Sequence, residues 1–276
     1  MNSLIVDSLE KLRKKNILNP ELDLRIILKK SSKKNKDLIL SNINTDDINI
    51  KTFKKLLSKR LEYKPISKII KKKHFWKNEF YVNTQVLDPR PESEIIIEET
   101  LKIYKNRSQK LKILDIGTGS GCLSISLANE YVESTITAID VSKQALKVAQ
   151  KNIQKFNLEK KIKLKLTSIE NIKNKFDLII SNPPYLTDNE YKNCQLEIKK
   201  YEPKIALSGG KDGLKFYRIY SNILHKIMNK GSYFICEIGN QQLDQCIKIF
   251  EKSKLSLINT KKDLQNTERT MIFTKI

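Results

Sequence analysis

The fold is indicated by one stretch of the sequence, Lys112-Ile113-Leu114-Asp115-Ile116-Gly117-Thr118-Gly119-Ser120-Gly121. Its first five residues predict a short apolar strand. The three glycines that follow let the backbone turn tightly and let a ligand approach closely. Their GxGxG spacing differs from the GxGxxG of many dinucleotide sites. A strand, a glycine loop and then a helix are typical of the cofactor-binding edge of an α/β sheet.

Further strands and helices alternate after that stretch. Phe176-Asp177-Leu178-Ile179-Ile180 and the run Tyr233 to Ile238 are apolar and short enough to be buried strands. Ala145 to Ile153 carries apolar residues at helical spacing. This alternation predicts a doubly wound, Rossmann-like α/β sheet over residues 91–276, mostly parallel and with helices on both faces.

The N-terminal part of the chain differs, because residues 1–72 contain no glycine and read as helical. Two sets of apolar residues recur at helical spacing: Val6, Leu9 and Leu12 in the first, and Phe53, Leu56, Leu57 and Leu61 in the second. We expect a small helical bundle. Residues 73–90 are predicted to form a linking β-hairpin, with strands His74-Phe75-Trp76 and Phe80-Tyr81-Val82 around a turn at Lys77-Asn78-Glu79. Ser93 is expected to cap the next helix.

Two acidic residues qualify the predicted cofactor site. Asp115 lies two residues before Gly117, where a carboxylate suits an ammonium group better than a pyrophosphate. Asp140 ends the strand that begins at Thr135, and a carboxylate there can accept both hydroxyls of a ribose. Residues 117–121 and these two acids therefore favour S-adenosylmethionine, although these features alone leave NAD open.

The tetrapeptide Asn182-Pro183-Pro184-Tyr185 follows the strand that ends at Ser181, so it is expected at the same sheet edge as the glycine loop. An amide or aromatic amino nitrogen is planar and a poor nucleophile. The Asn182 side-chain oxygen and the Pro183 carbonyl can each accept one of its N–H bonds. Pro184 stiffens the loop, and Tyr185 offers a flat face to a planar group. The pattern predicts methyl transfer to such a nitrogen by in-line displacement, without a covalent intermediate or a metal.

Composition adds less. The net charge of +22 is compatible with an acidic partner, but lysine predominates over arginine and is spread along the chain, which favours compositional bias and only non-specific affinity for nucleic acid. No run of apolar residues is long enough for a membrane span. The first residues lack a signal-peptide core, so a cytoplasmic protein is expected. The four cysteines are expected to be reduced thiols. Nothing calls for an oligomer, and we expect a monomer.

With these residues in view, the chain resembles the bacterial N5-glutamine methyltransferases that modify peptide chain release factors. The resemblance covers nearly the whole sequence. It rests on Phe75-Trp76, residues 88–94 (Asp-Pro-Arg-Pro-Glu-Ser-Glu), Asp115 to Gly121, Asn182 to Tyr185, Tyr201-Glu202-Pro203 and Asp212-Gly213.

The resemblance implies a class I methyltransferase that uses S-adenosylmethionine to methylate the glutamine of the GGQ motif in release factors. It implies that residues 117–121 (Gly117, Thr118, Gly119, Ser120 and Gly121) and Asp140 bind the cofactor, with Asn182 to Tyr185 around the glutamine amide. We assign Asn182 to the cofactor site as well. The N-terminal helices and hairpin would dock the protein substrate, and Arg90 is predicted at the substrate. Where the family commonly has an acid and an aromatic near the adenine, this chain has Ser168 and Ile169, which we assign to the same place. The family also commonly has a hydrophobic residue where Asp88 stands.

Two other functions share some of these features. An N6-adenine methyltransferase acting on DNA or RNA would use the same tetrapeptide, because its acceptor nitrogen is also planar. No target-recognition domain or arginine cluster accompanies it here. A basic RNA-binding protein on a methyltransferase fold would not need Gly117, Asp140 and Asn182 together. We therefore predict the release factor methyltransferase.

Overall fold

The computed structural model describes residues 3–33 and 45–275, and the chain divides into two compact units. The helical unit consists of Met1–Lys71 and Gln195–Tyr201. The sheet unit consists of Lys72–Cys194 and Glu202–Ile276. The sequence places residues 195–201 in the domain spanning 91–276, whereas in the structure they pack with the N-terminal helices. Within the described residues, no helix has the length and apolar character needed to cross a bilayer.

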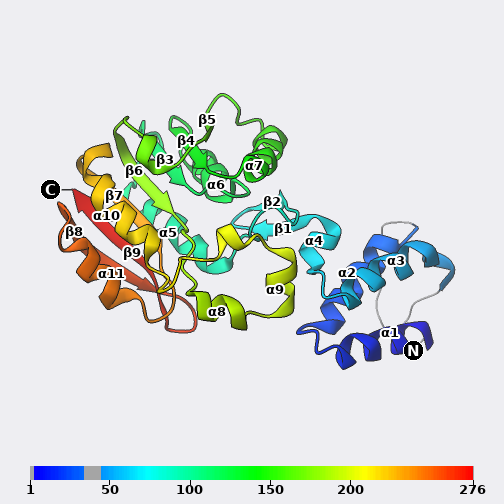
Figure 1. Cartoon of the computed structure of the whole chain (residues 1–276). Helices are drawn as coiled ribbons and strands as arrows, with labels where there is room; N and C mark the ends of the chain where they lie inside the picture. The colour runs from blue at the N-terminus through cyan, green and yellow to red at the C-terminus, as the bar shows by residue number, and fades with distance from the viewer. Residues whose placement is uncertain (1–2, 34–44, 276) are drawn as a thin grey trace. The chain divides into compact units, whose positions relative to one another are not determined.

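The helical unit is built on a small apolar core. Its elements are α1 (Ser3–Lys14), α2 (Pro20–Ser31), the 3-10 turn η1 (Thr45–Asp47), α3 (Ile50–Leu61), α4 (Ile66–Ile70) and α9 (Leu196–Tyr201) (Figure 1). Pro20 begins α2 with its fixed φ, and the Asn49 side chain caps α3 by accepting from the Thr52 N–H at 3.0 Å. The predicted inward face of the first helix is one residue out: Val6 is 36% exposed, and Ile5 takes its place in the core beside Leu9 and Leu12.

A buried ion cluster joins three segments of the helical unit. The Arg60 guanidinium donates through Nε to Asp23 Oδ2 at 2.6 Å and through Nη2 to Glu197 Oε1 at 2.7 Å. Burial raises the pKa of Asp23, and its hydrogen bond from Arg60 opposes that shift. The Tyr201 hydroxyl donates to the Glu62 carbonyl at 3.0 Å. These contacts explain why α9 belongs to this unit although it lies far away in the sequence.

The sheet unit contains a seven-stranded sheet in the described part of the chain, with the order β5-β4-β3-β6-β7-β9-β8. The strands from β5 to β7 are parallel, and β9 is antiparallel to both β7 and β8. They are β3 (Lys112–Ile116), β4 (Thr135–Asp140), β5 (Ile162–Leu166), β6 (Phe176–Ser181), β7 (Met228–Glu237), β8 (Leu255–Lys262) and β9 (Glu268–Lys275). The predicted mostly parallel α/β sheet is confirmed. The last two strands were not predicted.

Helices cover both faces of the sheet, as Figure 1 shows. Successive strand residues alternate between two hydrophobic clusters: Ile113 and Leu178 pack on one face, and Leu114 and Ile179 on the other. That alternation explains why the central strands are apolar at nearly every position. The helices are α5 (Glu94–Ile103), α6 (Cys122–Glu130) and α7 (Lys143–Lys155) on the first face, and α10 (Lys215–Ile227) and α11 (Leu243–Phe250) on the second. Short elements η2 (Pro91–Ser93), η3 (Ile169–Asn171), α8 (Asp188–Asn193) and η4 (Lys204–Ala206) lie in the connections.

The predicted hairpin is present as β1 (Lys72–Phe75) and β2 (Asn78–Tyr81), with a shorter turn than expected. Trp76 lies in the turn rather than in a strand and has φ of 53°. Its backbone N–H donates to Glu94 Oε1 and its indole N–H donates to Glu130 Oε1 at 2.8 Å. These two bonds to α5 and α6 hold the left-handed conformation that a tryptophan rarely adopts.

Candidate active site

The three predicted loops start from neighbouring strand ends. In the parallel register, Ile116 of β3 is opposite Ile139 of β4 on one side and Ser181 of β6 on the other. The glycine loop, Asp140 and the acceptor tetrapeptide therefore leave the sheet at adjacent points. The strand order also reverses here, since β4 and β6 flank β3 on opposite sides. Ligands of open α/β sheets bind at such a point, beyond the carboxyl ends of the strands.

The glycine loop leaves open space beside its backbone. Gly117 and Gly119 have φ of 72° and 55°, and a Cβ added to Gly117 would meet nothing within 4 Å. Gly121 differs, because its Cβ would contact Ala149 of α7 at 3.4 Å, which indicates a packing role. The loop is held at its far end by the buried Asn152, whose Nδ2 donates to the Ser120 carbonyl at 2.8 Å and to the Tyr81 carbonyl at 2.9 Å.

Asp115 is buried beneath this loop, with 1% of its surface exposed. Its Oδ2 accepts hydrogen bonds from Thr118 Oγ1 at 2.7 Å and from Ser124 Oγ at 2.6 Å. Oδ1 has no partner among the described residues. Burial raises the pKa of Asp115 to about 6, against the two hydroxyl bonds that lower it. A buried carboxylate oxygen without a partner is costly, so this oxygen is available to a donor such as an ammonium group.

Asp140 at the end of β4 is tied to the loop. Its Oδ2 accepts from the Gly119 N–H at 3.0 Å, and its Oδ1 accepts from the Ser142 N–H at 2.8 Å. Each oxygen keeps a further lone pair for a hydroxyl. Burial raises the pKa of this group as well, opposed by the backbone hydrogen bonds. Open space at the glycines, the unpartnered oxygen of Asp115 and the acceptor capacity of Asp140 together fit the predicted cofactor.

The two residues assigned to the adenine are less accessible than the sequence implies. Ser168 is half-buried and precedes η3, without a side-chain capping bond. Ile169 is buried at 4% exposure within the hydrophobic cluster that also contains Ile116 and Ile139. Ile169 therefore packs mainly on the sheet, which leaves little of its side chain for contact with a ligand.

The acceptor loop is rigidly supported. Pro183 is buried, and Asn182 and Tyr185 are half-buried. The Tyr185 carbonyl accepts from Gln242 Nε2 at 2.9 Å. A Cβ added to Gly213 would lie 2.3 Å from that same carbonyl oxygen, and one added to Gly209 would lie 2.8 Å from the Pro184 carbonyl oxygen. Backbone packed this closely leaves the tetrapeptide little freedom to move.

Side chains distant in sequence meet at Asn182. Its Nδ2 donates to Ser93 Oγ at 2.7 Å. Ser93 Oγ donates to Glu237 Oε2 at 2.5 Å, and the Tyr185 hydroxyl donates to Glu237 Oε1 at 3.1 Å. Ser93 stands at the N-cap position of α5 as predicted, but its side chain makes no capping bond, since its hydroxyl turns to Glu237 instead. Glu237 itself was missed; the signal was a single acid within the otherwise apolar run Tyr233 to Ile238, on the strand beside the acceptor strand.

Arg90 forms an ion pair rather than pointing freely to a substrate. Its Nη2 lies 2.6 Å from Glu202 Oε2, and the Glu202 side chain is almost fully buried. Glu202 belongs to the Tyr201-Glu202-Pro203 element noted in the sequence. The pair ties the segment before α5 to the segment that follows α9 in the chain.

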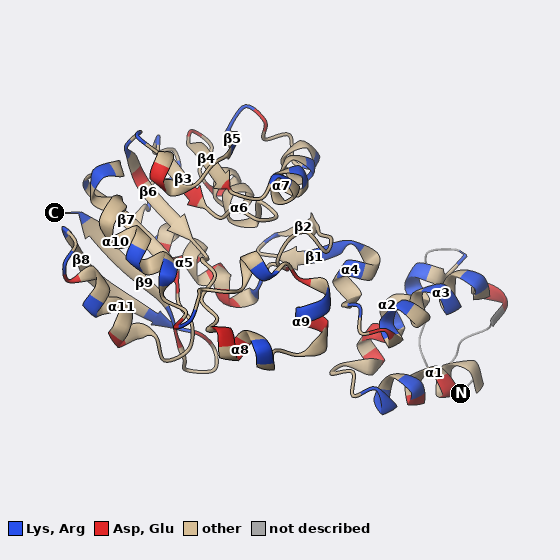
Figure 2. Ribbon diagram, viewed as in Figure 1, with Lys and Arg blue, Asp and Glu red and all other residues tan. Residues whose placement is uncertain are grey.

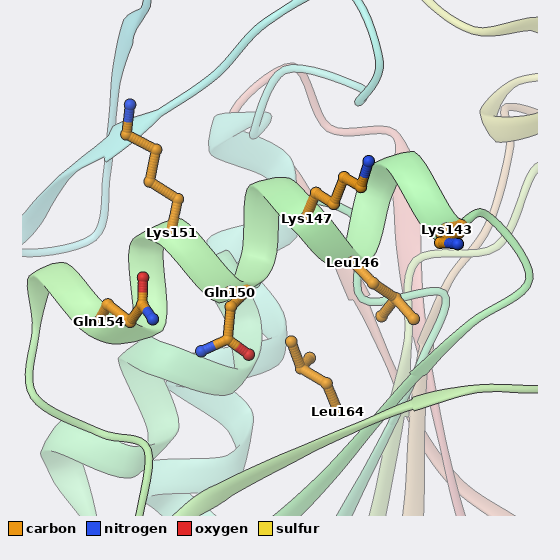
Figure 3. A pocket seen from close by; sticks show the side chains of 7 residues that line it. All are labelled: Lys143, Leu146, Lys147, Gln150, Lys151, Gln154 and Leu164. Atoms are coloured by element: carbon orange, nitrogen blue, oxygen red, sulfur yellow. The ribbon is translucent and has the colours of Figure 1, made fainter.

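An open cavity of about 600 Å³ lies elsewhere, on the outer face of α7. Figure 3 shows its lining side chains: Lys143, Leu146, Lys147, Gln150, Lys151, Gln154 and Leu164. None of the predicted site residues contributes to it. Figure 2 shows that basic residues occur on helices of both units, so the lysines of α7 are part of a general distribution.

The comparisons with known proteins find methyltransferases. The family model for the methyltransferase small domain matches residues 93–201. The chain is similar to a bifunctional methyltransferase of Rickettsia bellii, with 35% identity over 95% of this chain and 52% of the relative. It is also similar to a release factor glutamine methyltransferase of Buchnera aphidicola, with 34% identity over 94% of both chains. The chain thus spans about half the length of the bifunctional relatives it matches.

A solved structure supports the fold. The hMettl16 catalytic domain, solved with an RNA hairpin, superimposes with a TM-score of 0.55 at 17% identity, over 71% of this chain and 75% of that one. At this identity the likeness concerns the architecture of the sheet and its helices.

Proposed function

The chain belongs to the family of release factor glutamine methyltransferases, and from that membership we propose that it transfers a methyl group from S-adenosylmethionine to the side-chain amide nitrogen of the glutamine in the GGQ motif of peptide chain release factors. The observation that carries the proposal is the hydrogen bond that orients Asn182. The NH₂ group of its side chain donates to Ser93, so its carbonyl oxygen faces the other way and can accept an N–H bond from the nitrogen that is to be methylated.

The cofactor half of the site uses the glycine loop and two acids. Asp115 Oδ1 would accept from the ammonium end of the cofactor, and the Asp140 carboxylate would accept from its ribose hydroxyls. Backbone at Gly117 and Gly119 leaves room for close approach. The bound cofactor supplies an electrophilic methyl group on a sulfonium centre.

The acceptor half works by orientation. Asn182 Oδ1 and the Pro183 carbonyl accept the two N–H bonds of the glutamine amide, which turns the nitrogen towards the methyl carbon. With the cofactor bound, the amide nitrogen would form the new N–C bond as the S–C bond breaks. The electron pair of the S–C bond would stay on sulfur, and one amide proton would leave to water. Tyr185 packs beside the amide plane with its hydroxyl tied to Glu237. Proximity and alignment supply most of the acceleration.

The helical unit has a part in this proposal. A release factor is a large substrate, and recognition of it needs surface beyond the loops at the strand ends. We propose that the helices of residues 1–72, with the hairpin of residues 73–90, dock the protein substrate. The relatives do not favour adenine methylation, because two that match nearly the whole chain are named release factor glutamine methyltransferases.

The test is methyl transfer from labelled S-adenosylmethionine. Purified protein is incubated with a release factor, with the same factor carrying alanine in place of the GGQ glutamine, and with nucleic acid. The proposal expects label in the first only. Label in nucleic acid with none in the release factor would overturn the proposed substrate. Label in none of the three samples would overturn the proposed methyltransferase activity.

A further inference from the structure

Four side chains from three separate segments form one continuous hydrogen-bonded chain in the sheet unit: Ser93 of η2, Asn182 and Tyr185 of the acceptor loop, and Glu237 of β7. The carboxyl group of Glu237, at the end of β7, accepts from Ser93 Oγ and from the Tyr185 hydroxyl. Ser93 Oγ in turn accepts from Asn182 Nδ2 at 2.7 Å. Ser93 and Glu237 are both buried, with 3% and 1% of their surface exposed. The network therefore joins both polar residues of the acceptor tetrapeptide to a single buried acid.

The direction of these bonds follows from the chemistry of the carboxylate. An ionised carboxyl group has no proton and can only accept. Ser93 must therefore direct its single O–H at Glu237, which leaves only its lone pairs for Asn182. Only the NH₂ edge of the Asn182 amide can bond to a lone pair. The carbonyl edge of that amide is then fixed on the opposite side.

Without that constraint, the amide would have two nearly equivalent orientations. The nitrogen and oxygen of an asparagine side chain have similar shapes, and a serine hydroxyl free to rotate can donate to the oxygen as readily as it accepts from the nitrogen. In the reversed orientation, Asn182 would present N–H groups to an acceptor amide that itself carries N–H groups. The N–H groups of Asn182 would then face the N–H groups of the substrate amide, and no hydrogen bond from Asn182 would hold the substrate nitrogen.

We propose that Glu237 is a positioning residue that acts through Ser93 to fix which edge of the Asn182 amide faces the methyl acceptor. This deepens the proposed function and rests on it. The second bond, from Tyr185, holds the other end of the tetrapeptide on the same acid. Glu237 needs no contact with the substrate, since its effect is carried by the Ser93 hydroxyl.

Burial raises the pKa of Glu237 to about 7, so the acid is ionised, and the direction of these bonds is fixed, above about pH 7. Arg269 of β9 lowers the pKa of Glu237, and Glu92 of η2 raises it. Burial is the largest influence and raises it. Arg269 is itself held by Asp263 Oδ2 at 2.8 Å, so its charge is fixed beside the acid. Ser93 and Tyr185 donate the two bonds that favour the ionised form.

The first experiment measures kcat and cofactor Kd for Ser93→Ala, Glu237→Gln and the double variant, with a release factor as substrate. Ser93→Ala removes the hydroxyl that links Glu237 to Asn182. In Glu237→Gln the new side-chain amide can both donate and accept, so the direction of the Ser93 hydrogen bond is no longer fixed. We expect each variant to lose about 10- to 100-fold in kcat, with cofactor Kd nearly unchanged. Because both act through one path, the double variant should lose little more than the worse single variant. Ser93→Thr keeps the hydroxyl and should restore most of kcat.

Tyr217→Phe is the matched control. The Tyr217 hydroxyl is buried and donates to the backbone carbonyl of Glu237 at 3.1 Å, so its removal disturbs the same residue without touching the carboxyl group. Its kcat should stay close to wild type. Independent losses that multiply in the double variant, or an equal loss in Tyr217→Phe, would overturn the positioning role in favour of a structural one.

A second measurement does not depend on turnover. The side-chain NH₂ resonances of Asn182 are assigned in ¹⁵N-asparagine-labelled protein by their disappearance in Asn182→Ala. We expect them to shift in Ser93→Ala and Glu237→Gln but not in Tyr217→Phe. If wild type transfers no methyl group to a release factor, the proposed function fails while these shifts still decide the network. Unchanged resonances in both network variants would overturn the inference.

Discussion

Ile116 of β3 and Ser181 of β6 are direct register partners on neighbouring parallel strands. The residues that follow them, Gly117 and Asn182, therefore begin their loops side by side. A second contact locks the pair, because Ser181 Oγ donates to the Ile116 carbonyl at 3.0 Å. The loop assigned to the methyl donor and the loop assigned to the acceptor are thus fixed against each other by the sheet itself. That relationship makes separate predictions for the two loops possible.

Asn182→Ala tests the acceptor loop. Removing the amide takes away one of two acceptors for the glutamine N–H groups, and we expect kcat to fall by about 100- to 1000-fold. Cofactor Kd, measured by titration calorimetry, should change little. A variant with normal kcat would refute the acceptor role, and a variant that no longer binds cofactor would assign Asn182 to the other half of the site.

Asp140→Ala tests the cofactor loop. Loss of a carboxylate that accepts charge-assisted hydrogen bonds should weaken cofactor affinity by about 1–3 kcal/mol. Lys147→Ala is the matched control, because Lys147 lies on the outer face of α7 and lines the cavity there. Its affinity should match wild type. Equal affinities for Asp140→Ala and wild type would count against the assignment of the ribose to Asp140.

Glu237 gives a prediction about stability and pH. Burial in the fold raises its pKa from 4.5 to about 7. Between these two values, the folded protein holds a proton that the unfolded chain has released, so stability falls as the pH rises. Glu237→Gln cannot titrate. The free energy of unfolding of wild type, relative to this variant, should therefore fall by up to about 3 kcal/mol between pH 4.5 and about pH 8.

Urea unfolding of both proteins at several pH values provides the measurement. Asp115 also has a raised pKa, but it titrates in both proteins and cancels in the difference. A difference in unfolding free energy between the two proteins that does not change with pH, or that grows in favour of wild type at high pH, would show that the fold does not raise the pKa of Glu237.

The buried cluster in the helical unit predicts a strong effect of Arg60→Met. This substitution leaves the Asp23 carboxylate buried without its partner and removes the bond to Glu197. Breaking such a pair costs about 3–5 kcal/mol. Arg13→Met is the control, because Arg13 and Glu21 form an ion pair whose two side chains are 58% and 49% exposed, and such pairs contribute about 0–1 kcal/mol. Similar midpoints of urea unfolding for the two variants would contradict the role of the cluster.

The parts of this fold that could be predicted are those written in consecutive residues. The strand at Lys112–Ile116 and its glycine loop carry their signal locally, since burial on both faces demands an apolar run and the turn demands glycine. The tetrapeptide after Ser181 is equally local. Strand β8 escaped prediction because it lies at the sheet edge and has no buried residue after Leu255, so it lacks an apolar run. Strand β9 does carry a short buried run, Thr270 to Phe273, which was not predicted as a strand.

The hydrogen bonds that hold the site residues in place could not be predicted for a different reason. Ser93 and Glu237 are 144 positions apart in the chain, and Asn182 and Ser93 are 89 apart. Local reasoning made Ser93 a helix cap, which is the usual role of a serine before a helix. Only the sheet brings the end of β7 beside the end of β6 and so makes the acid a better partner. The same limit applies to Arg60, whose partner Glu197 is 137 positions away.

The most direct test of the central claim is mass spectrometry of a release factor after incubation with the protein and S-adenosylmethionine. Fragmentation of the peptide that contains the GGQ motif locates any added methyl group. The account predicts one methyl group on the side-chain amide nitrogen of the glutamine, absent when the protein carries Asn182→Ala. An unmodified glutamine after incubation with cofactor-bound, folded wild-type protein, or a methyl group at another residue, would contradict it.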